Sequence, residues 1–66
     1  MLKIEIKSDD KMIFTTRARN KNEAKIILLD VCRAKDFILE ADWNKNIFSV
    51  VNGNTKNKYK CQIEEE

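Results

Sequence analysis

The chain contains no histidine and no proline, and Gly53 is the only glycine among its 66 residues. Histidine is the commonest general base in enzymes, the usual partner of a serine or cysteine nucleophile, and the commonest metal ligand. Ser8 and Ser49 therefore have no histidine to activate them, and Cys32 and Cys61 alone cannot complete a four-ligand zinc site. One glycine also excludes a glycine-rich phosphate loop. We expect a protein that is not an enzyme and that holds no cofactor and no metal.

Long hydrophobic runs are also missing. No segment approaches the roughly 18 consecutive apolar residues that span a membrane, and residues 1–5 carry charges where a signal peptide needs an apolar core. We therefore expect a cytoplasmic protein with no membrane partner. A reducing compartment predicts that Cys32 and Cys61, which form no CxxC motif, are free and buried as small apolar groups. A disulfide between them is the alternative.

Charges of the two signs nearly balance. Lys and Arg number 13 against 11 Asp and Glu, which gives a net charge of +2. This bias is too small to indicate nucleic-acid binding unless the basic residues gather in one patch. The length predicts one domain over residues 1–66, with a small core and marginal stability. The last three residues, 64–66, are all Glu, and we expect them to form a free end.

Alternating apolar and polar residues over 2–7 and 11–19 predict two strands joined by a turn at 8–10. The side chains that share the apolar face are Leu2, Ile4, Ile6, Met12, Phe14, Thr16 and Ala18. A three-residue turn places Ile6 opposite Met12. The apolar faces of both strands then coincide, which favours this register.

A helix is predicted to follow and to end near residue 35. Asn20 or Asn22 can cap its N-terminus, and Glu23 lies in the first turn, where a negative charge is favourable. The apolar stripe expected to face the sheet consists of Ala24, Ile27, Leu28, Val31 and Ala34. Ile26 and Leu29 point away from that stripe, which a helix packed on a single sheet does not require.

The rest of the chain predicts three more strands. Residues 37–43 alternate, and turn-forming residues occur at 44–45 and within 52–55. The apolar residues expected on one face are Phe37, Leu39, Ala41, Trp43, Phe48, Val50, Tyr59, Cys61 and Ile63. The turns place Ala41 opposite Phe48, and Phe48 opposite Tyr59.

Together these segments predict an α+β fold of order ββαβββ, with one helix packed on one face of a single antiparallel sheet. The alternative extends the helix to about residue 40 and leaves four strands, ββαββ. That β-grasp-like plan resembles the layout of the immunoglobulin-binding domains. No motif accompanies the resemblance, so no functional residue carries over from it.

Two carboxylate pairs are the remaining candidates for chemistry. Asp9 and Asp10 lie in a predicted turn, where an aspartate side chain bonds to nearby backbone N–H groups. Glu40 and Asp42 share the outer side of a predicted strand, where a solvated surface explains them. Neither pair predicts an active site.

The sheet face opposite the helix is expected to carry a basic half. If the last strand lies beside the first, six basic side chains gather there, away from Glu40 and Asp42. They are Lys3, Lys7, Arg17, Arg19, Lys58 and Lys60. Such a surface can bind phosphates or an acidic protein, although an ordinary solvated face explains it equally well. The absence of aromatic rings from this face argues against binding of single-stranded nucleic acid.

Apolar side chains at positions expected to be exposed are the second lead. They are Ile26, Leu29, Ile13, Ile38, Ile47 and Val51. Contact with another protein, or with a second copy in a homodimer, would cover them. We therefore expect a small non-enzymatic binding protein that docks on another protein, and its size and Lys- and Asn-rich composition fit a phage or mobile-element modulator or inhibitor of a host protein. The alternative is a nucleic-acid-binding domain that uses the basic face on phosphates.

Overall fold

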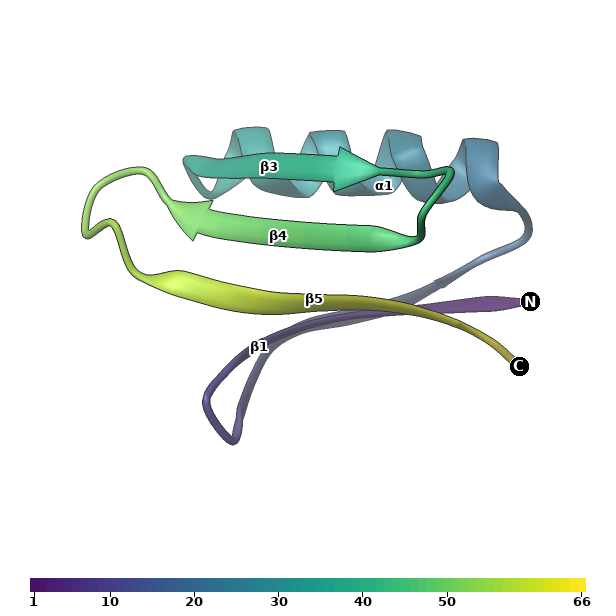
Figure 1. Ribbon diagram of the computed structural model, residues 1–66, viewed down its shortest axis with the longest axis horizontal. Helices are drawn as coiled ribbons and strands as arrows, with labels where there is room; N and C mark the ends of the chain where they lie inside the picture. The colour runs from purple at the N-terminus through teal and green to yellow at the C-terminus, as the bar shows by residue number, and fades with distance from the viewer.

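The computed structural model describes residues 1–66 and contains one helix and one antiparallel sheet of five strands (Figure 1). In chain order the elements are β1 (Leu2–Ser8), β2 (Lys11–Ala18), α1 (Lys21–Ala34), β3 (Phe37–Asp42), β4 (Ile47–Asn52) and β5 (Lys58–Glu65). This order confirms the α+β prediction of ββαβββ. The alternative with four strands is wrong, because α1 ends at Ala34 and residues 37–42 form a strand.

The strands lie in the order β2-β1-β5-β4-β3, so β5 joins the two hairpins at the centre of the sheet. This neighbourhood of β1 and β5 is the one on which the predicted basic half depended. β2 and β3 are the two edge strands. The helix α1 packs on one face of the sheet, which we call the inner face, and the opposite face is the outer face. In Figure 1, α1 runs directly behind β3.

The ends of α1 follow from local side-chain chemistry. The Asn20 side chain accepts a hydrogen bond from the Glu23 N–H at 2.9 Å, and the Glu23 carboxylate accepts one from the Arg19 N–H at 3.2 Å. These two bonds satisfy free donors at the N-terminus of the helix. At the other end Asp36 adopts a positive φ of 56° and turns the chain into β3.

The buried side of α1 follows the row Ala24, Leu28 and Cys32. Ile27 and Val31 pack at its margins, as predicted. The predicted burial of Ala34 is wrong, because the core follows successive steps of four residues and reaches Cys32 instead. Ala34 is exposed in the last turn.

The β1–β2 hairpin contains a β-bulge that the sequence analysis missed. Ile6 pairs with Phe14 and Lys7 pairs with Met12, so Ile13 is an extra residue on β2. The bulge leaves Met12 42% exposed and turns Ile13 toward the core, against which it packs. The predicted pairing of Ile6 with Met12 and the predicted exposure of Ile13 are therefore wrong.

The second hairpin has the predicted register, with Ala41 opposite Phe48. Between β4 and β5, however, Val50 rather than Phe48 lies opposite Tyr59. The Asn52 N–H donates to the Asn57 carbonyl at 2.8 Å, which closes a turn over residues 53–56, one residue later than predicted. Moving a turn by one residue shifts the register by two, so every side chain stays on its predicted face.

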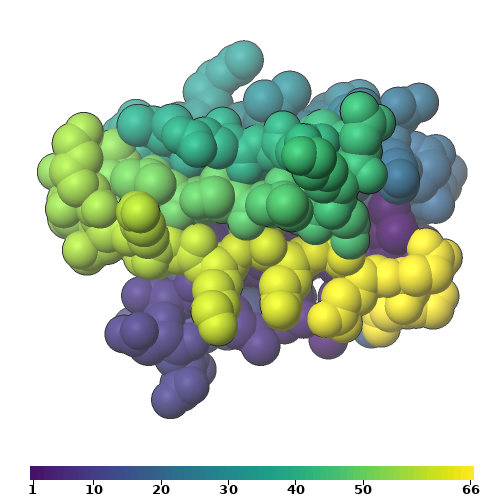
Figure 2. Space-filling model, viewed as in Figure 1, coloured from purple at the N-terminus to yellow at the C-terminus, as the bar shows by residue number.

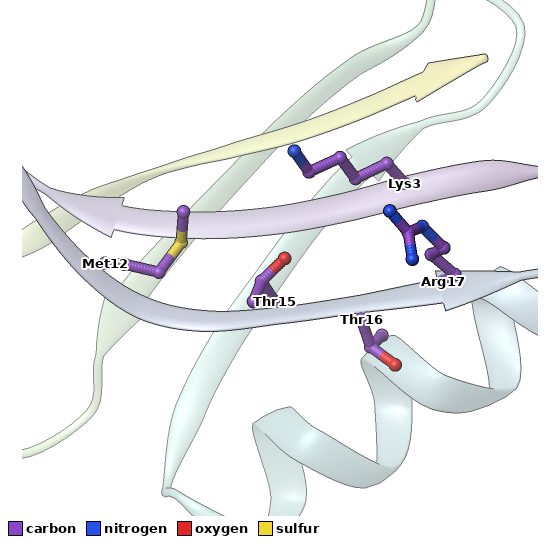
Figure 3. Close-up of a pocket in the computed structure, with 5 residues that line it drawn as sticks. All are labelled: Lys3, Met12, Thr15, Thr16 and Arg17. Carbon is purple, nitrogen blue, oxygen red and sulfur yellow. The ribbon is translucent and has the colours of Figure 1, made fainter. Parts of the chain in front are cut away.

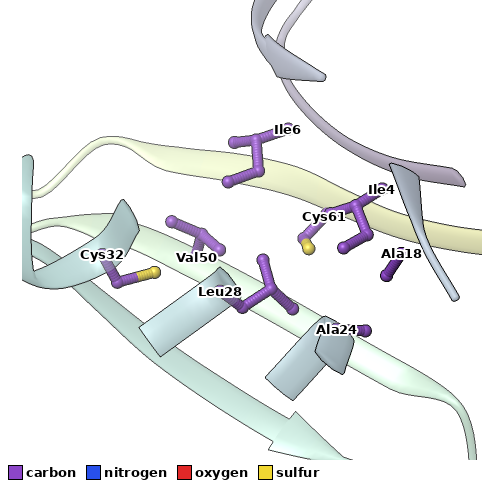
Figure 4. Close-up of a cluster of buried hydrophobic side chains, with 8 residues drawn as sticks. All are labelled: Ile4, Ile6, Ala18, Ala24, Leu28, Cys32, Val50 and Cys61. Atoms are coloured by element: carbon purple, nitrogen blue, oxygen red, sulfur yellow. The ribbon is translucent and has the colours of Figure 1, made fainter. Parts of the chain in front are cut away.

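The core lies between α1 and the inner face. Its eight buried residues are Ile4, Ile6, Ala18, Ala24, Leu28, Cys32, Val50 and Cys61 (Figure 4). All five aromatic residues pack against this cluster from the inner side, as predicted. Two edge-to-face pairs, Phe37 with Tyr59 and Trp43 with Phe48, extend it beneath the helix.

The C-terminal residues belong to the sheet, so the expectation of a free end at 64–66 is wrong. Leu2 pairs with Glu65 and Lys3 pairs with Glu64. The Glu66 N–H donates to the Met1 carbonyl at 2.8 Å. The two ends of the chain therefore lie side by side, as Figure 1 shows.

Candidate interaction surfaces

The polar residues considered for chemistry lie on the outer face and its turns. Asp9 and Asp10 form the β1–β2 turn and line an open hollow together with Lys7, Lys58 and Ser49. Ser49 lies opposite Lys60 in the β4–β5 ladder, but no hydrogen bond joins the two side chains. The outer face therefore brings together ions of opposite sign around this turn.

Half of the six basic residues predicted on the outer face are paired with acids of the same chain. Glu5 lies between Lys3 and Lys7 on β1, with Lys3 Nζ at 3.9 Å and Lys7 Nζ at 3.6 Å from its carboxylate oxygens. Glu5 is only 9% exposed, because the two lysine side chains flank it. The strict alternation of β1 places all three residues on one face, so the pairing of Glu5 with the two lysines could have been predicted from the sequence.

Arg17 is also paired. Its Nε donates to a Glu66 carboxylate oxygen at 2.7 Å. This hydrogen bond is the main reason that the pKa of Glu66 lies below its ordinary value and the pKa of Arg17 above its own. The sequence analysis missed the pair because it treated residues 64–66 as a free end. Arg19 lies beyond β2, in the connection to α1, and adds nothing to the face.

Two basic residues of the face, Lys58 and Lys60 on β5, make no ion pair in the structure. Lys60 lies opposite Lys7 in the β1–β5 ladder. The cationic part of the outer face is therefore a narrow area around three lysines, smaller than the six-residue patch that was predicted.

A second open hollow lies over β1 and β2, lined by Lys3, Met12, Thr15, Thr16 and Arg17. Figure 3 shows Thr16 pointing to the opposite side of β2 from Met12, Thr15 and Arg17. This arrangement agrees with the pairing of Thr16 with Ile4 of the core. Lys3, Thr15 and Arg17 therefore lie around this open hollow on the same side as Met12.

Exposed aliphatic side chains lie on α1 and on the outer side of β3 and β4. Ile26 and Leu29 on α1 are 61% and 56% exposed, and Ile38 on β3 and Ile47 on β4 are 50% and 59% exposed. These four positions agree with the predicted exposure. Val51 is half-buried and lies opposite Ile38 on the outer face. Ile13 does not join this group, because the bulge directs it to the core.

One row of side chains on α1 lies beside β3, as the contacts at the two ends of the row show. Lys25 Nζ lies 5.2 Å from the centroid of the Trp43 ring, just beyond the end of β3. Arg33 lines an open hollow with Phe37 and Ile38, at the start of β3. Lys25, Leu29 and Arg33 are four residues apart and form one row on the helix. Leu29 therefore lies beside the middle of β3.

Comparison with known protein families, with curated proteins and with solved structures finds no match for this chain. The structure has no helix with the length and apolar character needed to cross a membrane.

Proposed function

We propose that this protein is a non-enzymatic binding protein that docks on another protein through the side formed by α1, β3 and β4. The observation that carries this proposal is the exposure of Ile26, Leu29, Ile38 and Ile47, each at least half exposed, on those three elements. Exposed apolar patches on a small protein mark interaction sites. A partner that covers them explains their placement.

Burial of these four side chains alone does not supply enough free energy for a stable complex. Burying the exposed half of a large aliphatic side chain contributes about 1 kcal/mol, half of the gain for complete burial. Four such contributions fall short of the roughly 8 kcal/mol of a micromolar complex, before the cost of association is counted. The complex therefore needs further contacts, either apolar surface of the partner or hydrogen bonds and ion pairs.

A binding protein without catalytic groups acts by occupying a surface of its partner. We therefore propose that the chain modulates or inhibits the protein on which it docks, and its composition favours a phage or mobile-element origin with a host protein as the partner. The two free thiols, Cys32 and Cys61, support a cytoplasmic location, because free cysteines persist in a reducing compartment.

Affinity purification with matched variants tests the proposal. The variant with Ile26→Glu and Leu29→Glu removes two of the four aliphatic groups, and Lys58→Glu with Lys60→Glu introduces the same number of glutamates on β5, outside the proposed docking side. We expect the first variant to lose a protein partner that the wild type and the second variant retain, after nuclease treatment and with unchanged circular dichroism. Loss of the partner only in the lysine variant would contradict the proposal.

Nucleic-acid binding is the second candidate, favoured by the unpaired Lys58 and Lys60 beside Lys7. If these lysines contact phosphates, a gel shift with mixed DNA and RNA should show affinity that falls steeply between ~50 and ~200 mM salt. Absence of binding at the lower salt concentration would exclude this function.

A further inference from the structure

The outward edge of β3 has backbone groups without partners. β3 lies at the end of the sheet and pairs only with β4. Outside the ladder, no backbone or side-chain hydrogen bond reaches an N–H or C=O of residues 37–42. An edge strand of this kind can accept a further strand.

The hydrogen bonds that flank the hairpin identify the outward groups. The Gly53 N–H donates to the Asp36 carbonyl at 2.8 Å, so the backbone groups of Asp36 point toward β4. Along an antiparallel strand the direction alternates, so Ile38 and Glu40 also point toward β4. The N–H and C=O groups of Phe37, Leu39 and Ala41 therefore point outward.

The two edges of the sheet differ in how well they are protected. β2 carries a bulge at Ile13 and the basic side chains of Lys11 and Arg17, features that discourage strand addition. β3 has neither a bulge nor a lysine, and its register with β4 is regular from Phe37 to Asp42. The β3 edge is the one open to another strand.

The helix would cover the inner face of a strand added at this edge. The row of Lys25, Leu29 and Arg33 lies beside β3, and Figure 2 shows side chains of α1 extending past β3 at the top of the view. Inner-face side chains of an added strand would therefore meet Leu29, which is 56% exposed. This placement explains why a large aliphatic residue stands on the side of the helix.

Charge on the outer face of β3 indicates the chemistry of the occupant. Glu40 is exposed and makes no ion pair, and Asp42 carries a second carboxylate on the same face. Ile38 precedes them and is half exposed. Side chains directly opposite each other in a sheet stabilise it when their charges are opposite. A strand with basic residues on its outer side complements β3.

We propose that β3 accepts an extended segment of a partner protein as a sixth strand. The segment alternates aliphatic residues, which pack under Leu29, with basic residues, which lie beside Glu40. This inference rests on the proposed docking function and specifies how the partner binds. A second copy of β3 is a poor occupant, because symmetric pairing brings the acidic faces of two β3 strands together.

NMR with a defined probe tests this mode of binding. The probe is a capped eight-residue peptide that alternates valine and lysine, with a valine and glutamate peptide as its control. We expect the Leu39 and Ala41 amides to exchange at least tenfold more slowly with the lysine peptide, because these N–H groups become hydrogen-bonded. The glutamate peptide should bind at least tenfold more weakly.

Two substitutions distinguish strand addition from other contacts. Ala41→Pro removes an outward N–H without touching the β4 ladder and should weaken binding at least tenfold, whereas Ala41→Val keeps the N–H and should bind like the wild type. Glu40→Lys should reverse the preference between the two peptides. Unchanged binding by the Ala41→Pro variant would overturn strand addition.

Other outcomes also decide against the inference. Shifts confined to β1, β2 or β5, or no shift at a peptide concentration of about 1 mM, would overturn it. Self-association that Ala41→Pro abolishes would show that a second copy occupies the edge. None of these results affects the affinity purification with Ile26→Glu and Leu29→Glu, so the proposed docking function stands or falls separately.

Discussion

Gly53 is a residue at which the fold leaves no room for a side chain. A Cβ atom at this position would lie 2.6 Å from the Asp36 carbonyl oxygen, and the Gly53 N–H donates to that same oxygen at 2.8 Å. Gly53→Ala must therefore push apart the first bond that joins β3 to β4. We expect a loss of about 1–3 kcal/mol in the free energy of unfolding, the range of other overpacked sites.

Urea denaturation measures this loss, with Asn54→Ala as the control. Asn54 is exposed and uses only its backbone N–H, which donates to the Asn52 side chain at 2.8 Å. The control should therefore lie within about 0.5 kcal/mol of the wild type. Equal stability of the two variants would show that the chain relaxes around Gly53 without cost.

Cys61 makes the stability depend on alkaline pH. Burial, with a smaller effect of Cys32, raises the pKa of the Cys61 thiol to about 11. Between about pH 9 and 11 the unfolded chain releases this proton and the folded chain retains it, so the unfolding free energy falls as pH rises. This stability is fully present below about pH 9, and the loss amounts to roughly 2 kcal/mol by pH 11.

The difference in stability between wild type and Cys61→Ala isolates this effect, because every other ionisable group is present in both proteins. We expect chemical denaturation from pH 8 to 11 to show this difference narrowing as the pH rises. Parallel curves over the whole range would contradict burial of the thiol.

At the scale of elements, the bulge in the β1–β2 hairpin predicts which of two neighbouring residues contributes more to stability. Alternation assigned Met12 to the core and Ile13 to solvent, and the bulge exchanges them. Ile13→Ala should lower the unfolding free energy by about 1–2 kcal/mol, less than at a fully buried site. Met12→Ala should change it by less than about 0.5 kcal/mol. Thermal denaturation of both variants checks that Ile13→Ala loses more stability than Met12→Ala. A larger loss of stability in Met12→Ala would place the bulge elsewhere.

The three hairpins show what local sequence can determine. Asn44 and Lys45 lie at the centre of a regular turn, so the β3–β4 register followed from alternation alone. The β4–β5 turn was misplaced because its position depends on Asn52, whose side chain accepts bonds from the N–H groups of Asn54 and Thr55. The β1–β2 bulge was missed because period-two alternation contains no signal for an inserted residue.

The helix was easier to predict than its buried face. The Asn20 cap and the Glu23 charge are local features and were found from the sequence. The burial of Cys32 instead of Ala34 depends on the angle at which α1 crosses the sheet, which no local pattern fixes.

For the molecule as a whole, the exposed aliphatic residues were predicted more fully than the charged surface. Ile26, Leu29, Ile38 and Ile47 follow from helical and strand periodicity, which the structure retains in these elements. The pairing of Arg17 with Glu66 requires β5 to reach the end of β1, a long-range contact that periodicity cannot supply. The open edge of β3 likewise depends on strand order.

Site-specific photo-crosslinking tests the central claim, that the α1–β3–β4 side docks on a protein. A photoreactive phenylalanine analogue would replace Leu29 or Ile38 in one set of chains, and Thr15 on β2 or Lys60 on β5 in another. We expect a nuclease-resistant protein adduct of one mass from positions 29 and 38 in the native cells, and none from positions 15 and 60. Adducts from positions 15 and 60 alone, or adducts that nuclease removes, would contradict the account.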